Sequence, residues 1–135
     1  MKTTKSIFAS LVLILLVSVS AMAQSEAKVI AVVNHAEWCP ACKNNGERAH
    51  AAFMENNKDG AVQFVVNNLT NDETKKASAE ELKKVGLDKA MAPYTGTGVA
   101  YFFDAKTKVL INQVSVAKPN DELAQALVTA KKGVK

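Results

Sequence analysis

Two cysteines separated by two residues are the groups in this chain best suited to chemistry, in the run Trp38-Cys39-Pro40-Ala41-Cys42. Pro40 suits the first turn of a helix, because its missing N–H would have no partner there. Residues three positions apart share one face of a helix, so both sulfurs would approach bonding distance. A disulfide across so short a loop adds little stability, since that stabilisation grows with loop length. The spacing therefore predicts a redox-active dithiol.

A helix start would give the two sulfurs different properties. The first sulfur would lie beside unpaired backbone N–H groups and the positive end of the helix dipole, which favour a thiolate and lower the pKa of Cys39. Cys39 is therefore the predicted nucleophile, and Cys42 the resolving thiol that breaks a mixed disulfide. Lys43 adjoins the pair and would add positive potential if its side chain turned towards the sulfurs.

Apolar runs and turn residues outline the elements around this pair. The β-branched run 28–33 predicts a central strand, followed by a loop over 34–38 and a helix from Pro40 to about Asn57. A second helix is expected to start with Asp72 or Thr74 as its cap, and residues 88–98 are expected to be irregular. The remaining elements are strands over 61–66, 99–103 and 109–116 and a last helix after Pro119.

This order, β-α-β-α-β-β-α, predicts a single α/β domain. A crossover through a helix makes the first two strands parallel, and the short 104–108 connection makes the last two an antiparallel hairpin. We expect a three-layer sandwich with a mixed four-stranded sheet and helices on both faces. The cysteine pair would lie where the first strand ends and the first helix begins.

The first residues have the pattern of a secretory signal peptide. Lys2 and Lys5 precede an apolar run over 7–19, and residues 20–23 have the small-x-small pattern of a cleavage site. The run is short for the roughly 20 residues that span a bilayer. We predict that residues 1–23 are removed after Ala23, leaving 24–135 as an exported domain, periplasmic or extracellular, without a membrane segment.

Charge gives no indication of a nucleic-acid partner. The chain has 17 basic and 13 acidic residues and a net charge of +4, of which Lys2 and Lys5 lie in the predicted signal peptide. Through 72–89, lysines alternate with acidic residues and form no stripe that would follow a phosphate backbone.

The residues around the cysteines resemble the active-site segment of the thioredoxin superfamily. The segment reads Ala36-Glu37-Trp38-Cys39-Pro40-Ala41-Cys42-Lys43 and follows an apolar strand. The element order resembles that family over all of 24–135, and the sequence does so over 29–43. The resemblance implies a thioredoxin fold, exchange between protein thiols and disulfides, a partner that recharges the dithiol, no bound cofactor, and Trp38 packed over the sulfurs. Exported members typically act on envelope proteins.

The chain departs from the family pattern before and within the active-site strand. The family has an extra strand and helix ahead of that strand, for which 24–27 leaves no room, so a trimmed fold is expected. The family also has a buried Asp that helps to move the resolving cysteine's proton, and Val33 stands in its place. The proton would then pass through water or a nearby group such as Glu37. The Pro40-Ala41 pair does not tell the direction of electron flow.

A third departure concerns the substrate-docking loop. The family places a cis-proline beside the dithiol, just before the third core strand. Counting back from Phe103, the equivalent position is Gly98, preceded by Thr97, and Pro93 would take that place only in a rearranged loop. Gly98 would still allow close backbone approach.

Metal binding is the alternative use of the pair. Structural zinc would need four ligands, so the cysteines would have to recruit His35 and His50. Haem attachment is excluded, because Lys43 stands where a histidine is required. Thiolates bind Cu(I), and exported thioredoxin-like folds serve as copper chaperones, with wider cysteine spacing and a distant histidine. The sequence therefore predicts a metal-free thiol–disulfide oxidoreductase, with a copper-binding protein as the alternative.

Overall fold

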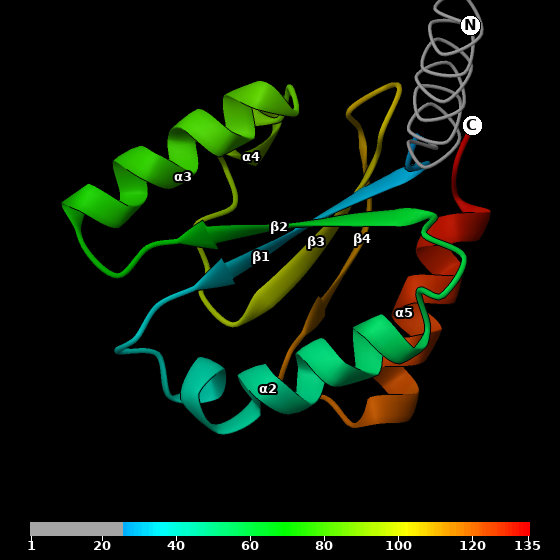
Figure 1. Cartoon of the computed structure of the whole chain (residues 1–135), viewed down its shortest axis with the longest axis horizontal. Helices are drawn as coiled ribbons and strands as arrows, with labels where there is room; N and C mark the ends of the chain where they lie inside the picture. The colour runs from blue at the N-terminus through cyan, green and yellow to red at the C-terminus, as the bar shows by residue number, and fades with distance from the viewer. Residues whose placement is uncertain (1–25) are drawn as a thin grey trace, which may run out of the picture.

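The computed structural model describes residues 26–135, so the predicted signal peptide and its cleavage point lie outside it. The elements follow in the predicted order (Figure 1). They are β1 (Val29–His35), α2 (Pro40–Glu55), β2 (Val62–Asn68), α3 (Asp72–Lys84), α4 (Asp88–Met91), β3 (Val99–Asp104), β4 (Leu110–Ser115) and α5 (Asn120–Lys132). The short helix α4 was not predicted, because residues 88–98 were expected to be irregular.

The four strands form one mixed sheet in the order β2-β1-β3-β4. Strand β1 is parallel to β2 and antiparallel to β3, and β3 is antiparallel to β4. The prediction of a parallel first pair and an antiparallel hairpin is therefore confirmed. The fold is a thioredoxin-like α/β sandwich, with β1 inside the sheet and β2 and β4 at the edges of the part described.

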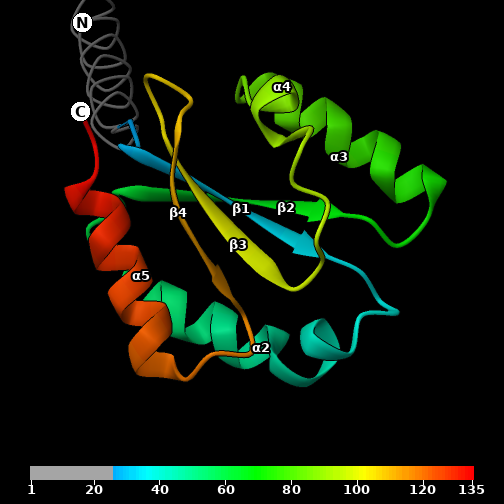
Figure 2. The same ribbon diagram turned by 180° about the vertical axis from the view of Figure 1, so that it is seen from behind.

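Helices cover both faces of the sheet, as predicted. Helices α2 and α5 lie on one face and α3 and α4 on the other (Figures 1 and 2). Each face of the sheet has its own apolar core. Val29 and Ala31 of β1 pack in the core under α2 and α5, and Ile30 and Val32 pack in the core under α3 and α4. A strand buried on both faces has no polar face, which is why β1 is continuously apolar from Val29 to Val33. Within residues 26–135, no helix combines the length and apolar character needed to cross a membrane.

Several boundaries differ from the sequence-based prediction by one or two residues, and two of these differences have a clear structural reason. Strand β1 extends through Asn34 and His35, which were expected in a loop, because both continue the pairing with Asn67 and Asn68 of β2. Helix α3 is capped by Asn71 rather than by either predicted residue. The Asn71 side chain accepts the N–H of Thr74 at 2.9 Å, and the Thr74 hydroxyl accepts the N–H of Asn71 at 3.0 Å. Reciprocal bonding of this kind satisfies two otherwise unpaired donors.

Candidate active site

The cysteine pair lies at the start of α2, where the sequence placed it. Cys39 is the N-cap residue, with extended backbone at φ −83° and ψ 115°, and Pro40 follows in the first turn. The backbone N–H of Cys42 donates to Cys39 Sγ at 3.4 Å. The first sulfur therefore takes the position that a serine or aspartate oxygen takes in an ordinary N-cap.

The environment of Cys39 favours its ionised form. Cys39 is 4 % exposed, and burial by itself raises the pKa of a thiol. Hydrogen bonds outweigh burial: the Cys42 thiol, the Thr97 hydroxyl and the backbone N–H groups of Cys42 and Ala41 hold the pKa of Cys39 below its ordinary value. A thiolate at this position accepts several donors without a neighbouring cationic side chain.

The environment of Cys42 favours its protonated form. Burial raises the pKa of the Cys42 thiol, and the hydrogen bond with Cys39 and the charge on Cys39 act in the same direction. Backbone hydrogen bonds from Ala36 and Gly98 act against them. The Cys42 thiol also lies 3.9 Å from the main-chain oxygen of Asn34, which accepts from it. The two cysteines thus differ in the way expected of a nucleophile and a resolving thiol.

Gly98, and not Pro93, is the residue that lies against the dithiol. Its φ is +75°, in the left-handed region that suits glycine. A Cβ at this position would lie 3.1 Å from the Cβ of Ala41, 3.5 Å from Cys39 Sγ and 3.8 Å from Cys42 Sγ. The Gly98 N–H donates to the Asn34 oxygen at 2.8 Å, so a proline has no place in this conformation.

Trp38 is tied to the segment after β2 and stays exposed. Its indole N–H donates to the Thr70 carbonyl at 3.1 Å, and the backbone N–H of Glu37 donates to the Thr70 hydroxyl at 3.1 Å. The side chain is 59 % exposed, whereas the buried cluster around the sulfurs contains Ala36 and Ala41. The indole of Trp38 is therefore fixed by its bond to Thr70.

Lys43 and Glu37, both proposed from the sequence as supporting groups, are exposed. Neither is among the main influences on the pKa of Cys39 or Cys42.

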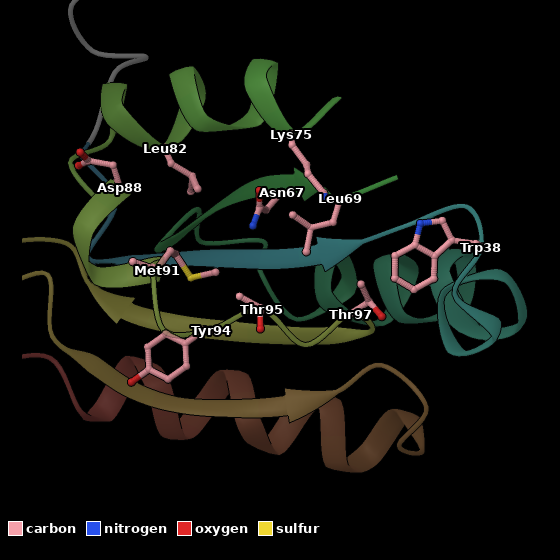
Figure 3. A pocket seen from close by; sticks show the side chains of 11 residues that line it. Trp38, Asn67, Leu69, Lys75, Leu82, Asp88, Met91, Tyr94, Thr95 and Thr97 are labelled. Atoms are coloured by element: carbon pink, nitrogen blue, oxygen red, sulfur yellow. The ribbon is translucent and has the colours of Figure 1, made fainter. Parts of the chain in front are cut away.

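A hollow of about 460 Å³ lies between the sheet and helices α3 and α4. Figure 3 shows Trp38 and Thr97 at its dithiol end and Leu82 and Met91 at the far end. Most of its lining is apolar, with Asp88 among the few charged residues. We call it the Trp38 hollow. It places an apolar surface next to the loop that carries Thr97.

A second hollow, of about 720 Å³, runs along α2 on the opposite face of the sheet. Cys42 lines it together with Phe53 and the exposed Val66 of the edge strand β2. His35 and His50 line it as well. Within the described range 26–135, no group of three or more His, Cys, Asp or Glu side chains is arranged to hold a metal ion. We call this space the Cys42 hollow.

Asn34 is a site residue that the sequence analysis missed. It is fully buried, and its side chain bonds to Asn67 of β2 and to the loop that precedes β3. Its signal in the sequence is a polar residue that ends an otherwise apolar strand next to the cysteine motif.

Fold and site together define a class, a thioredoxin-like domain with a Cys-x-x-Cys pair at the N-terminus of the helix that follows the first described strand. The chain is similar to three solved structures at low sequence identity. One is Trxlp from Edwardsiella tarda EIB202, with 16% identity, a TM-score of 0.48, and coverage of 82% of this chain and 91% of that chain.

The second is thioredoxin from Fasciola hepatica, with 16% identity, a TM-score of 0.48, and coverage of 76% of this chain and 81% of that chain. The third is a domain of a possible thiol-disulfide isomerase from Cytophaga hutchinsonii ATCC 33406, with 20% identity, a TM-score of 0.45, and coverage of 81% of this chain and 79% of that chain. No protein-family model and no curated protein matches the chain.

Proposed function

We propose that this protein is a thiol–disulfide oxidoreductase that exchanges disulfides with other proteins through Cys39 and Cys42. The observation that carries the proposal is geometric: Cys39 is the N-cap of α2, and the N–H of Cys42, on the same turn, donates to Cys39 Sγ at 3.4 Å. The pKa of Cys39 is lowered by hydrogen bonds, and the pKa of Cys42 is raised, first of all by burial. A purely structural disulfide would need no such difference between its sulfurs.

In the reducing direction, the Cys39 thiolate attacks one sulfur of a protein disulfide. A mixed disulfide forms, the substrate S–S bond breaks, and the departing substrate thiolate takes a proton from water. Cys42 then loses its proton and attacks Cys39 Sγ, which releases the second substrate thiolate. The substrate gains two electrons and the dithiol becomes a Cys39–Cys42 disulfide. Oxidation of a substrate dithiol follows the same steps in reverse.

The proton of Cys42 leaves without a carboxylate at position 33, where this chain has Val33. The Cys42 hollow runs along the face of α2 that carries the thiol. We propose that water in this hollow accepts the proton.

The substrate is proposed to be an extended segment of a protein, lying between Trp38 and Thr97 with its disulfide over Cys39. The apolar lining of the Trp38 hollow suits an apolar side chain of that segment. The signal-peptide pattern of residues 1–23 supports export and therefore substrates outside the cytosol, including envelope proteins. A second dithiol protein would recharge the pair.

Single cysteine variants test this function. Cys39→Ser is expected to abolish insulin reduction, whereas Cys42→Ser is expected to accumulate mixed disulfides that non-reducing electrophoresis detects. Full turnover by Cys42→Ser would contradict the assigned roles.

Bound copper after purification, together with no exchange activity, would favour the metal-binding alternative. The reduction potential of the pair then separates a reductase from an oxidase.

A further inference from the structure

We propose that Asn34 is a positioning residue for the dithiol: its buried amide holds the 94–98 loop so that Thr97 stays against Cys39. The proposal rests on the proposed function of the same site. It assigns the role of loop anchor to a residue of the strand β1.

The side chain of Asn34 makes three hydrogen bonds inside the protein, which use both of its N–H donors and one acceptor position of its oxygen. Its Nδ2 donates to the carbonyl oxygens of Tyr94 and Gly96, each at 3.0 Å. Its Oδ1 accepts from Nδ2 of Asn67 at 2.9 Å. Asn34 is 0 % exposed, so any of these groups left unpaired would cost the free energy of a desolvated polar group. The bonds therefore specify one position for the loop.

The backbone of the same residue holds the loop on the other side of Thr97. The Asn34 carbonyl accepts the N–H of Gly98 at 2.8 Å. The same oxygen is the acceptor for the Cys42 thiol at 3.9 Å. Side chain and backbone of Asn34 thus bind Gly96 and Gly98, the two neighbours of Thr97, and one of the sulfurs.

Two glycines around Thr97 make such an anchor necessary. Glycine has more conformational freedom to lose than any other residue, and Gly98 is held at a φ of +75°. The backbone beside Thr97 lies against the dithiol, since a Cβ on Gly98 would be 3.5 Å from Cys39 Sγ, and in this position the Thr97 hydroxyl lowers the pKa of Cys39. A neutral amide holds the loop there without adding a charge beside the sulfurs, whereas an aspartate at position 34 would disfavour the thiolate.

A double-mutant cycle tests whether Asn34 acts through Thr97. The variants are Asn34→Leu, Thr97→Val and the pair together, with the rate of Cys39 alkylation measured against pH. Each single variant is expected to slow alkylation at neutral pH about threefold or more, because a hydrogen bond to the thiolate is lost. The double variant is expected to equal Asn34→Leu alone. Fully multiplicative effects would overturn the proposal.

Controls separate positioning from general stability. Thr97→Ser keeps the hydroxyl and is expected to keep the wild-type pH profile. Asn112→Leu removes another side-chain to main-chain bond, the one from Nδ2 to the Ala126 oxygen at 3.0 Å, on the β4 side of the sheet. It is expected to lower Tm and to leave the pH profile of Cys39 unchanged. A shifted profile in Asn112→Leu would show that destabilisation alone moves it, and would overturn the proposal.

If Asn34→Leu does not fold, Asn67→Leu replaces it in the cycle. This variant removes the partner of Asn34 Oδ1 but keeps both bonds to the loop, so a smaller shift in the same direction is expected. Unchanged profiles in both Asn67→Leu and Thr97→Val would overturn the proposal. Alkylation does not depend on turnover, so a wild-type protein without exchange activity but with the predicted coupling would contradict only the proposed function.

Discussion

The two ends of the β1–β3 strand pair carry different buried polar residues. At the dithiol end, Asn34 of β1 lies opposite Val99 of β3; at the other end, Val29 lies opposite Asp104. Asn34 and Asp104 are the buried polar residues of this strand pair. One end uses a neutral amide and the other a carboxylate.

Asp104 gathers backbone donors from two chain segments. Its Oδ1 accepts the N–H groups of Lys106 at 2.8 Å and Thr107 at 3.2 Å, and its Oδ2 accepts the N–H of Lys135 at 2.9 Å. These bonds, that of Lys135 first, lower the pKa of the Asp104 carboxyl. The carboxylate therefore ties the β3–β4 turn to the C-terminal residue.

The difference indicates where this fold tolerates charge. A carboxylate next to the dithiol would disfavour the Cys39 thiolate. Asp104 lies at the end of the strand pair away from the two cysteines, where its charge does not affect them. The amide at the dithiol end supplies donors and an acceptor but no net charge. The pKa of each cysteine is then set by burial, backbone donors and the other sulfur, and for Cys39 also by the Thr97 hydroxyl.

The largest expected effect comes from Gly98→Pro, which imposes the family's residue on the dithiol end. Proline cannot adopt the φ of +75° and lacks the N–H that donates to Asn34. We expect a loss of roughly 3 kcal/mol in the free energy of unfolding, from backbone strain and the loss of a buried hydrogen bond. Urea denaturation measures it. Wild-type stability would mean that this loop conformation is not required.

A smaller effect is expected from Gly98→Ala. Left-handed backbone costs a non-glycine residue about 1–2 kcal/mol, and the new Cβ meets Ala41 at 3.1 Å. We expect a loss of this size in urea denaturation and slower insulin reduction, because the methyl group lies against both sulfurs.

Gly60→Ala is the matched control for this variant. Gly60 has a similar φ of +69° with nothing within 4 Å of the added Cβ. It should lose comparable stability and keep the wild-type exchange rate. If both variants lost exchange activity equally, the slower insulin reduction of Gly98→Ala would not be caused by the contact of its new methyl group with the sulfurs.

At the opposite end, Asp104→Asn is expected to lower Tm by several degrees at neutral pH. The folded-state pKa of Asp104 is depressed, so its contribution is present above the unfolded pKa of about 3.9 and is lost as pH falls through the folded pKa. The difference in Tm between wild type and variant should therefore close in acid. Calorimetry over a pH series measures it.

Asp59→Asn controls for the loss of any acidic group. Asp59 pairs with Lys131 at 3.1 Å and is 59 % exposed, and exposed pairs contribute little. Its Tm is expected to stay close to that of the wild type. A difference in Tm for Asp104→Asn that persists in acid would contradict the role of the charge.

The smallest effect is expected from Lys43→Ala. Because local donors set the pKa of Cys39, removing this exposed cation should change its alkylation rate at neutral pH less than about twofold, with little dependence on salt. Alkylation of wild type against pH should show Cys39 reacting at lower pH than Cys42. A tenfold change in Lys43→Ala would mean that charge matters at this end too.

Local patterns in the sequence were enough to predict the order of strands and helices and the place of the cysteine pair. They failed where a residue's role depends on its neighbours in space. Asn34 was expected in a loop, and its strand conformation follows from pairing with β2.

The asymmetry between the cysteines begins with Pro40 and the three-residue spacing, which favour a helix start from the sequence alone. The anchoring of the 94–98 loop by the Asn34 amide is decided by the tertiary structure, since Tyr94 and Gly96, whose carbonyl oxygens accept from Asn34, are 60 and 62 positions away in the sequence. Hydrogen bonds over such separations depend on the register of β1 against β3, and that register follows from packing both faces of the sheet at once.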